Sequence, residues 1–425
     1  MEIRKVSVSL LKPHPDNPRI TLTPEDIEYQ QIEKSIDNNG YILPLVWNKR
    51  SGYIISGHQR LPILIAKGMK EIEVVVVDLD PQNECKLLIG LNKITGRWNN
   101  AKLAAMLDDM VKMPDFDSDI IGFTMPEISQ ILDRYGEQKD ADDFAFQGTL
   151  NTIETPVTKR GDLVELGSHK ILCGDSSSLE DLKLLMGTRK VNLVHADPPY
   201  NIRYMGGARP TAKGRPKKSR EWERIYADNM VQKDYIAGQK KVLTNVSQFL
   251  APGAPVYIWN AHKNFGPMHD MLTELNFHVA SVIVWAKPNF AISYSDYHEQ
   301  VEFCLYSWRK DKGSHKWYGP VNESSLWDSR RDVTRNYIHP TQKPIALAQR
   351  AIRNSSVRGD CVLDMFLGSG STLIAAETLG RCCYGLEIDC RYVDGIVRRY
   401  IDFVGPDKVS SKVLDKYCKE VKNEK

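Results

Sequence analysis

Motifs that bind metals or nucleotide phosphates are missing from this sequence. Its eight cysteines include no C-x-x-C pair and its ten histidines form no H-E-x-x-H or Cys/His group, so we expect no metal site. A G-x-x-x-x-G-K-S/T loop is also absent, which argues against a P-loop ATPase. Neither a secretory signal nor an apolar run long enough to span a bilayer is present, so we expect reduced thiols and a cytoplasmic location.

The length and charge of the chain indicate more than one domain. At 425 residues it exceeds one ordinary domain, and 42% hydrophobic residues are enough to form cores. The net charge of +3 conceals an asymmetry, since residues 1–150 hold 17 Lys and Arg against 23 Asp and Glu, whereas residues 151–425 hold 40 against 31. The basic charge therefore lies in the second part of the chain.

The most informative motif is the tetrapeptide Asp197-Pro198-Pro199-Tyr200. It follows an apolar run, 191–194, that predicts a buried strand. The Asp197 carboxylate can accept a hydrogen of an exocyclic amino group, the Pro-Pro turn offers a backbone carbonyl outside any strand ladder, and the Tyr200 ring can stack on a base. Methylation of a base nitrogen needs such groups, although a Pro-rich turn after a strand is also common as a purely structural feature.

A second motif, Phe366-Leu367-Gly368-Ser369-Gly370, joins a predicted strand at 361–364 to a predicted helix that ends near Gly380. Glycines in such a loop let the backbone approach a ligand, and the start of the helix favours a carboxylate or a phosphate. Leu373 stands where a dinucleotide fingerprint would have its third glycine, which argues against NAD.

A third apolar run, 382–386, ends in Glu387, where an acid after the next strand can bind ribose hydroxyls. Together, the glycine loop and Glu387 predict a nucleoside ligand with a carboxylate tail.

With these motifs in this order, the chain resembles the beta class of DNA amino-methyltransferases over roughly residues 160–405. The resemblance implies S-adenosylmethionine as cofactor, with Asp175 of Leu172-Cys173-Gly174-Asp175 at its adenine and the His339–Pro344 segment at its methionine end. Met365 departs from the family, in which Pro is frequent at that position. The cofactor-binding residues that the resemblance implies are Asp175, Thr341, Lys343, Asp364, Phe366, Gly368, Ser369, Gly370 and Glu387.

The implied reaction is direct attack of a held amine on the methyl group, with Asp197 and the Pro198 carbonyl as acceptors and Tyr200 stacked on a base flipped out of the duplex. Asp rather than Ser before Pro-Pro-Tyr favours adenine N6 in this family. Cytosine N4, an RNA or protein amide, and a partition-like DNA-binding protein with an idle catalytic half remain alternatives. DNA is the expected partner, and a homodimer is open.

A basic segment follows the tetrapeptide and suits contact with a phosphate backbone. A solvated surface loop is the alternative interpretation. The predicted DNA-binding residues are Arg203, Arg209, Lys213, Arg215, Lys217, Lys218 and Arg220.

Residues 1–80 show a different pattern, with predicted strands at 3–8, 45–48 and 53–56 and a predicted helix that begins near Thr23 and ends near Gly40. With Asn17-Pro18-Arg19 and Gly57-His58-Gln59-Arg60, this part resembles the ParB-like N-terminal domain, whose second box holds nucleotide phosphates. The longer arginine-rich box is missing here, because Pro62 and Ile63 follow. A nucleotide or a protein partner is therefore open, and Gly57, His58 and Arg60 could instead serve DNA or only the fold.

The remaining boundaries follow from periodicity. Helical patterns at 81–89, 101–111 and 126–135 predict an adaptor over 81–136, and an acidic run predicts a linker over 137–156. We expect the methyltransferase domain at 157–410 and a polar tail at 411–425. Additional predicted strands at 256–259, 279–285 and 301–306 complete a doubly wound, Rossmann-like α/β sheet, preceded by the small α+β domain. His298 or Glu299 could contact the target base or be structural.

Overall fold

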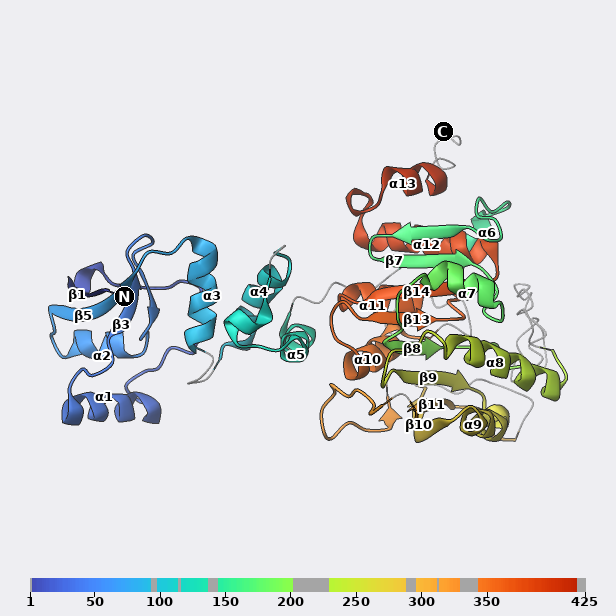
Figure 1. The fold of residues 1–425 in the computed structure, drawn as a ribbon, viewed down its shortest axis with the longest axis horizontal. Coiled ribbons are helices and arrows are strands. Elements are labelled where there is room, and N and C mark those ends of the chain that lie inside the picture. The colour runs from blue at the N-terminus through green and yellow to red at the C-terminus, as the bar shows by residue number, and fades with distance from the viewer. Residues whose placement is uncertain are drawn as a thin grey trace. The chain divides into compact units, whose positions relative to one another are not determined.

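The computed structural model describes residues 2–92, 98–113, 116–136, 144–201, 229–287, 296–311, 313–328 and 343–418. The chain folds into two compact units, residues 1–138 and 139–425 (Figure 1). In the described residues, no helix is both long enough and apolar enough to cross a membrane.

The first unit contains a mixed sheet in the order β1-β5-β3-β4-β2. Its described strands are β1 (Glu2–Ser7), β2 (Lys12–Pro13), β3 (Leu45–Asn48), β4 (Tyr53–Ser56) and β5 (Glu71–Val77). It also contains the helices α1 (Ile27–Asn39) and α2 (Arg60–Ala66). Apolar side chains from these elements, among them Leu45, Ile54 and Leu64, form one core. The three predicted strands and the helix before Gly40 are confirmed.

Three further helices, α3 (Pro81–Asn92), α4 (Asn100–Val111) and α5 (Met125–Tyr135), form a second core within this unit. Helix α5 begins with a capping box, in which the Thr124 hydroxyl accepts from the Glu127 N–H at 3.4 Å and a Glu127 carboxylate oxygen accepts from the Thr124 N–H at 2.7 Å. Ile55 of β4 belongs to the same core. The helical segments expected over 81–136 therefore share a core with the sheet of the same unit through Ile55 of β4.

The second unit is built on a sheet in which the described strands follow the order β12-β10-β11-β9-β8-β13-β14-β7-β6. Strands β7, β14, β13, β8 and β9 run parallel, whereas β6, β11 and β10 add antiparallel pairs. The strands are β6 (Leu163–Leu166), β7 (His169–Cys173), β8 (Leu193–Ala196), β9 (Pro255–Asn260), β10 (Phe277–Ala286), β11 (Val301–Arg309), β12 (Leu326–Trp327), β13 (Cys361–Asp364) and β14 (Cys382–Glu387).

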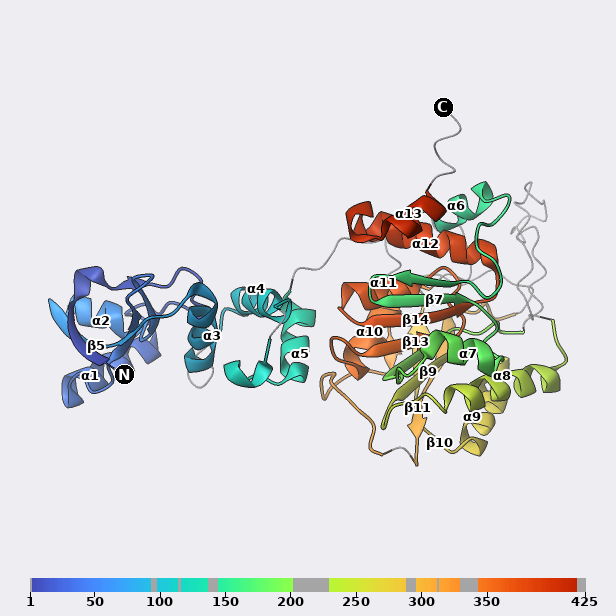
Figure 2. The ribbon, with the colours of Figure 1, turned by 45° about the horizontal axis from the view of Figure 1, so that its top comes forward.

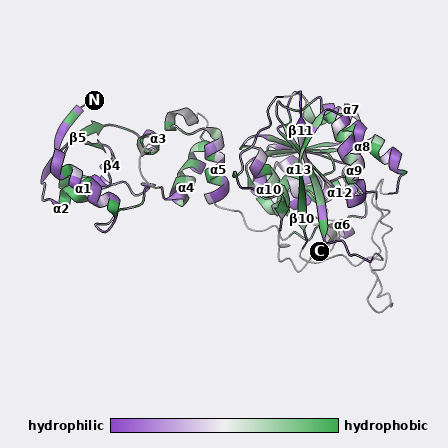
Figure 3. Ribbon diagram, turned by 90° about the horizontal axis from the view of Figure 1, so that it is seen from below, coloured by the Kyte–Doolittle hydropathy of each residue, from purple (hydrophilic) through white to green (hydrophobic). Residues whose placement is uncertain are grey.

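Helices cover both faces of this sheet, as Figures 1 and 2 show. One core includes side chains from α7 (Leu179–Met186), α8 (Gln232–Val246) and α9 (Phe265–Glu274). The other includes α10 (Ile345–Ser355), α11 (Ser371–Thr378) and α12 (Cys390–Val404). The strands at the centre are hydrophobic along most of their length (Figure 3), as expected for a sheet buried on both faces. The expected doubly wound α/β fold is confirmed.

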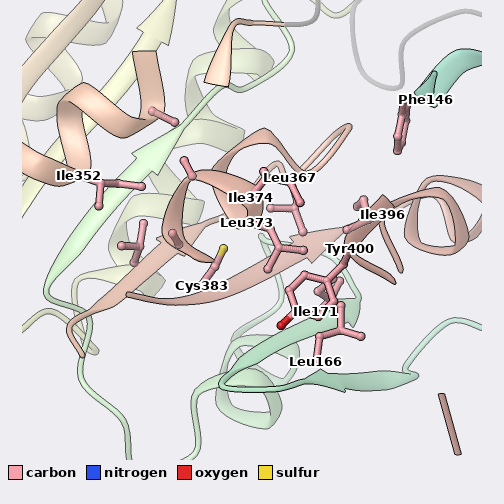
Figure 4. Close-up of a cluster of buried hydrophobic side chains, with 14 of the residues drawn as sticks. Phe146, Leu166, Ile171, Ile352, Leu367, Leu373, Ile374, Cys383, Ile396 and Tyr400 are labelled. Atoms are coloured by element: carbon pink, nitrogen blue, oxygen red, sulfur yellow. The ribbon is translucent and has the colours of Figure 1, made fainter. Parts of the chain in front are cut away.

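Figure 4 shows part of the core between the large sheet and helices α10, α11 and α12, in which Leu373 and Ile374 of α11 lie beside Cys383 of β14 and Ile396 of α12. All four side chains are buried, with at most 1% of their surface exposed. The short run of apolar residues after the glycine loop therefore fixes α11 firmly against the sheet, which places the loop itself.

Two segments differ from the sequence interpretation. Residues 146–152, expected in a linker, form α6 (Phe146–Thr152), and the Phe146 ring lies 5.7 Å from the ring of Tyr392. Residues 411–417, expected in a polar tail, form α13 (Ser411–Tyr417), and the buried Tyr417 hydroxyl lies 2.9 Å from that of Thr158. Both helices have few apolar residues, so their burial depends on surfaces supplied by α12 and was not visible in the local pattern.

Candidate active site

The predicted functional residues meet at one edge of the large sheet. Asp197 follows β8, Asp364 ends β13, Glu387 ends β14 and Asp175 follows β7. Because these four strands are parallel and neighbours in the sheet, their carboxyl ends lie side by side. This is the edge at which open α/β sheets bind ligands.

The tetrapeptide 197–200 is held in place by the residue that follows it. Asn201 has a positive φ of 52°, which asparagine tolerates better than most residues, and its side-chain oxygen accepts from the Met230 N–H at 2.7 Å. The Asn264 side chain donates to the Tyr200 carbonyl at 2.6 Å, and Lys263 Nζ donates to the Asn201 carbonyl at 2.5 Å. The chain therefore turns sharply after Tyr200 and keeps Asp197 and Tyr200 on the same side.

The ammonium group of Lys343 occupies the centre of this arrangement. Its Nζ donates to Asp197 Oδ1 at 2.6 Å and to the Tyr200 hydroxyl at 2.6 Å, and it lies 3.1 Å from Glu302 Oε2. The same atom lies 4.9 Å from the centre of the Tyr200 ring and 5.2 Å from that of Trp259. Two carboxylates, a hydroxyl and two aromatic rings thus surround one nitrogen, and we refer to the four side chains that carry them, Asp197, Tyr200, Trp259 and Glu302, as the amine cage.

Glu302 was not singled out from the sequence. It is the second residue of β11, which runs antiparallel to β9 and begins at the edge of the sheet where β9 ends. Lys287 Nζ lies 2.6 Å from Glu302 Oε1, and the Tyr200 hydroxyl donates to Glu302 Oε2 at 3.1 Å. Glu299, which the sequence did suggest, lies 3.3 Å from His262 instead and is half-exposed. The contact of His298 with a target base stays a prediction.

The two carboxylates of the amine cage differ in proton affinity. Burial raises the pKa of Asp197, with the nearby Lys343 acting in the opposite direction. Burial also opposes ionisation of Glu302, but Lys343 and Lys287 outweigh it and lower the pKa of Glu302 to about 2. Glu302 is therefore a permanent negative charge at neutral pH, whereas Asp197 is the more basic of the two.

The glycine loop has the left-handed backbone that its glycines predict, with φ of 54° at Gly368 and 84° at Gly370. A Cβ on Gly370 would lie 3.0 Å from the Ile396 side chain. Arg399, a buried residue of α12 that the sequence did not suggest, donates to the Ser369 carbonyl at 2.6 Å. Helix α12 thus holds one side of the glycine loop, and the opposite side is left for a ligand.

Glu387 links the loop to the end of β14. One carboxylate oxygen accepts from the Gly368 N–H at 2.8 Å and the other from the Asp389 N–H at 3.0 Å, and burial raises the pKa of Glu387 to about 7. The Asp175 carboxylate accepts from the Ser177 N–H at 2.8 Å. Each carboxylate oxygen has a second lone pair for a ligand hydroxyl or amine.

Lys343 is the predicted cofactor residue whose position differs most from the expectation. The resemblance implied a contact with the methionine end of the cofactor, but the side chain lies in the amine cage. Its main chain is the part near the glycine loop, since the Lys343 carbonyl accepts from Ser371 Oγ at 3.5 Å. Thr341 lies outside the described residues, as do the predicted DNA-binding residues Arg203, Arg209, Lys213, Arg215, Lys217, Lys218 and Arg220.

In the first unit, the predicted box at 57–60 is tied into the fold. Gly57 has a φ of 97°, and a Cβ there would lie 2.6 Å from Leu45 Cγ. His58 Nε2 accepts from the His14 N–H at 3.3 Å, and burial lowers the pKa of His58 to about 4. The Arg60 guanidinium donates to the Leu43 carbonyl. A ligand role for this box stays a prediction.

Comparisons with known proteins agree with both halves of this description. A family model described as DNA methylase matches residues 191–398, and the model of the ParB N-terminal domain matches residues 1–92. Type II methyltransferase M2.MboI of Moraxella bovis is 26% identical over 226 residues, which cover 49% of this chain and 80% of that protein. Type II methyltransferase M2.DpnII of Streptococcus pneumoniae is 26% identical over 222 residues, which cover 49% of this chain and 81% of the relative.

Among solved structures, that of a complex of M1.HpyAVI with SAM is similar, with a TM-score of 0.41 and 23% identity over 54% of this chain and 97% of that one. The DNA methylase match spans the tetrapeptide 197–200, Glu302, Lys343, the glycine loop and Glu387. Residues 191–398 therefore belong to the DNA methylase family, and the chain carries a ParB N-terminal domain at residues 1–92.

Proposed function

We propose that the second unit transfers a methyl group from S-adenosylmethionine to the exocyclic N6 of an adenine flipped out of DNA. The observation that carries this proposal is the amine cage. The cage holds one nitrogen donor against Asp197 Oδ1 and the Tyr200 hydroxyl, each at 2.6 Å, beside the faces of two aromatic rings. The Lys343 ammonium stands in for the target amine, because both present N–H donors to the same acceptors.

The residues beside the cage fit the proposed cofactor. Glu387 and Asp175 offer carboxylate oxygens for ribose hydroxyls and an adenine amine, and Gly368 and Gly370 have no side chain that would keep a ligand from the loop backbone. The free N–H groups at the start of α11 would favour binding of the cofactor's carboxylate. When bound, S-adenosylmethionine supplies a methyl group on a positively charged sulfur, which an amine can attack directly.

The chain's own groups would orient the amine and stabilise its charge. Asp197 accepts one amine hydrogen, which directs the nitrogen lone pair away from the carboxylate. Positive charge develops on that nitrogen as it takes the methyl group, and the Glu302 carboxylate, which Lys287 still pairs after Lys343 leaves, stabilises it. Asp197, whose pKa burial raises, is the carboxylate better suited to receive the surplus proton. The target amine displaces the Lys343 ammonium from the cage before the reaction.

Flipping the base costs a few kcal/mol of lost stacking, and the ring of Tyr200 offers a stacking surface that offsets this cost. The basic segment 203–220 would contact the DNA backbone, and the ParB N-terminal domain would add affinity for DNA, a nucleotide or a protein partner. We also propose a cytoplasmic protein with an adaptor at 81–136.

The test is methyl transfer from labelled S-adenosylmethionine to DNA, RNA and protein, followed by identification of the modified base. We expect label in DNA as N6-methyladenine and a loss of about 10²-fold or more in rate for Asp197→Ala, since one positioned acceptor is removed. Cofactor binding should survive this change. Label on cytosine N4, RNA or protein would replace the proposed substrate, and an inactive wild type that binds DNA would favour a regulatory protein.

A further inference from the structure

A chain of buried hydrogen bonds connects the amine cage with the glycine loop. Trp259 Nε1 donates to His195 Nε2 at 3.1 Å, and His195 Nδ1 lies 3.1 Å from Thr372 Oγ1. Thr372 Oγ1 then donates to Asp364 Oδ2 at 2.6 Å. The four side chains come from β9, β8, α11 and β13, and each exposes 4% of its surface or less.

The chemistry of the end groups fixes the direction of every bond. An indole N–H can only donate, so His195 Nε2 must be an unprotonated acceptor. The proton of the neutral ring therefore lies on Nδ1 and is donated to Thr372, whose hydroxyl hydrogen is left for Asp364. Burial, followed by the nearby Lys343, lowers the pKa of His195 to about 3, so the neutral ring persists at neutral pH.

The two ends of this chain belong to different parts of the site. The Trp259 ring is a wall of the amine cage, whereas Asp364 Oδ1 accepts from the Phe366 N–H at 2.9 Å, where the glycine loop begins. His195 itself lies on β8, two residues before Asp197, which follows the end of that strand. An ordinary core side chain would not need both ring nitrogens paired with groups from two binding regions.

We propose that His195 is a positioning residue with two arms. One arm is its hydrogen bond with Trp259, which sets the position of the amine cage. The other arm is the pair of hydrogen bonds through Thr372 to Asp364, which sets the position of the glycine loop. This inference rests on the proposed function, because it assigns the two arms to the two substrates of methyl transfer. His195 contributes one hydrogen bond to each arm, so the loss of one arm should impair one substrate and spare the other.

Two substitutions separate the arms. The amide of Asn reaches the position of Nδ1 and that of Gln the position of Nε2, so His195→Asn keeps the donor to Thr372 and His195→Gln keeps the acceptor for Trp259. For His195→Gln we expect the Kd for S-adenosylmethionine to rise roughly tenfold, with a single-turnover rate near that of the wild type at saturating cofactor. For His195→Asn we expect the Kd to hold and the rate to fall roughly tenfold.

Thr372→Val and Trp259→Phe are matched variants that remove the partner of His195 instead of His195 itself. Thr372→Val removes the hydroxyl that pairs with Nδ1, and Trp259→Phe removes the N–H that donates to Nε2. Thr372→Val should reproduce the His195→Gln pattern and Trp259→Phe the His195→Asn pattern, and they decide the question if the His195 variants do not fold. Equal changes of Kd and rate in both arms, or no change in either, would overturn the assignment. A wild type that fails to methylate DNA would instead refute the proposed function, and the two failures are thus distinguishable.

Discussion

Replacing Glu302 by Gln removes the charge of one cage carboxylate while keeping its size. Glu302 lies 2.6 Å from Lys287 and 3.1 Å from both Lys343 and the Tyr200 hydroxyl. The change would leave Asp197 as the remaining carboxylate of the amine cage, so positive charge on the target nitrogen loses one of two stabilising groups. We expect the rate of methyl transfer to fall by about 10²-fold, or about 2.7 kcal/mol in the activation free energy.

Single-turnover transfer at saturating S-adenosylmethionine measures this rate, and a separate binding titration measures the cofactor affinity. The affinity should stay near that of the wild type, because Glu302 contacts Lys287, Lys343 and the Tyr200 hydroxyl, which lie outside the glycine loop and are distinct from Glu387. Glu302→Asp, which keeps the charge on a shorter side chain, should recover part of the rate.

Glu299→Gln is the matched control, because it makes the same chemical change three residues earlier at a half-exposed side chain paired with His262. Its rate should stay close to that of the wild type. A near-normal rate for Glu302→Gln, or an equal loss for Glu299→Gln, would refute the assignment of Glu302 to the stabilisation of charge.

Two further predictions concern the cofactor edge and the first unit. Because burial raises the pKa of Glu387 to about 7, lowering the pH from about 8 to about 6 protonates most of this acceptor, and the affinity for S-adenosylmethionine should fall about tenfold. Titration calorimetry should show a smaller pH dependence for Glu387→Gln, and an unchanged one would exclude Glu387 from cofactor binding. Gly57→Ala should destabilise the first unit by about 2 to 4 kcal/mol, because it adds backbone strain at a φ of 97° to a clash with Leu45. Gly52→Ala, at a φ of 79° with open space around the position, should lower the free energy of unfolding by only about 1 to 2 kcal/mol. Hydrogen exchange of the first unit measures both changes, and an equal loss for the two variants would contradict the clash with Leu45.

Local signals explain why much of the fold could be predicted. The strand at 361–364 and the helix capped by Thr124 are marked by apolar runs and by capping residues within a few positions of the chain. Helices α6 and α13 escaped prediction because their buried faces are short, and α12 decides their burial. Their sequences alone resemble a linker and a tail.

The sequence by itself determined the positions of the tetrapeptide 197–200, the glycine loop and Glu387. Each of them stands at the end of a strand whose apolar run is continuous in the chain. Only the tertiary structure decided that Glu302 and Lys343 join Asp197, and that His195 connects Trp259 with Thr372. These partners are separated by at least 41 residues in sequence, the distance from Glu302 to Lys343. They meet because parallel strands, and an antiparallel strand that starts where these end, bring remote side chains to one edge, and no local pattern records which strands will be neighbours.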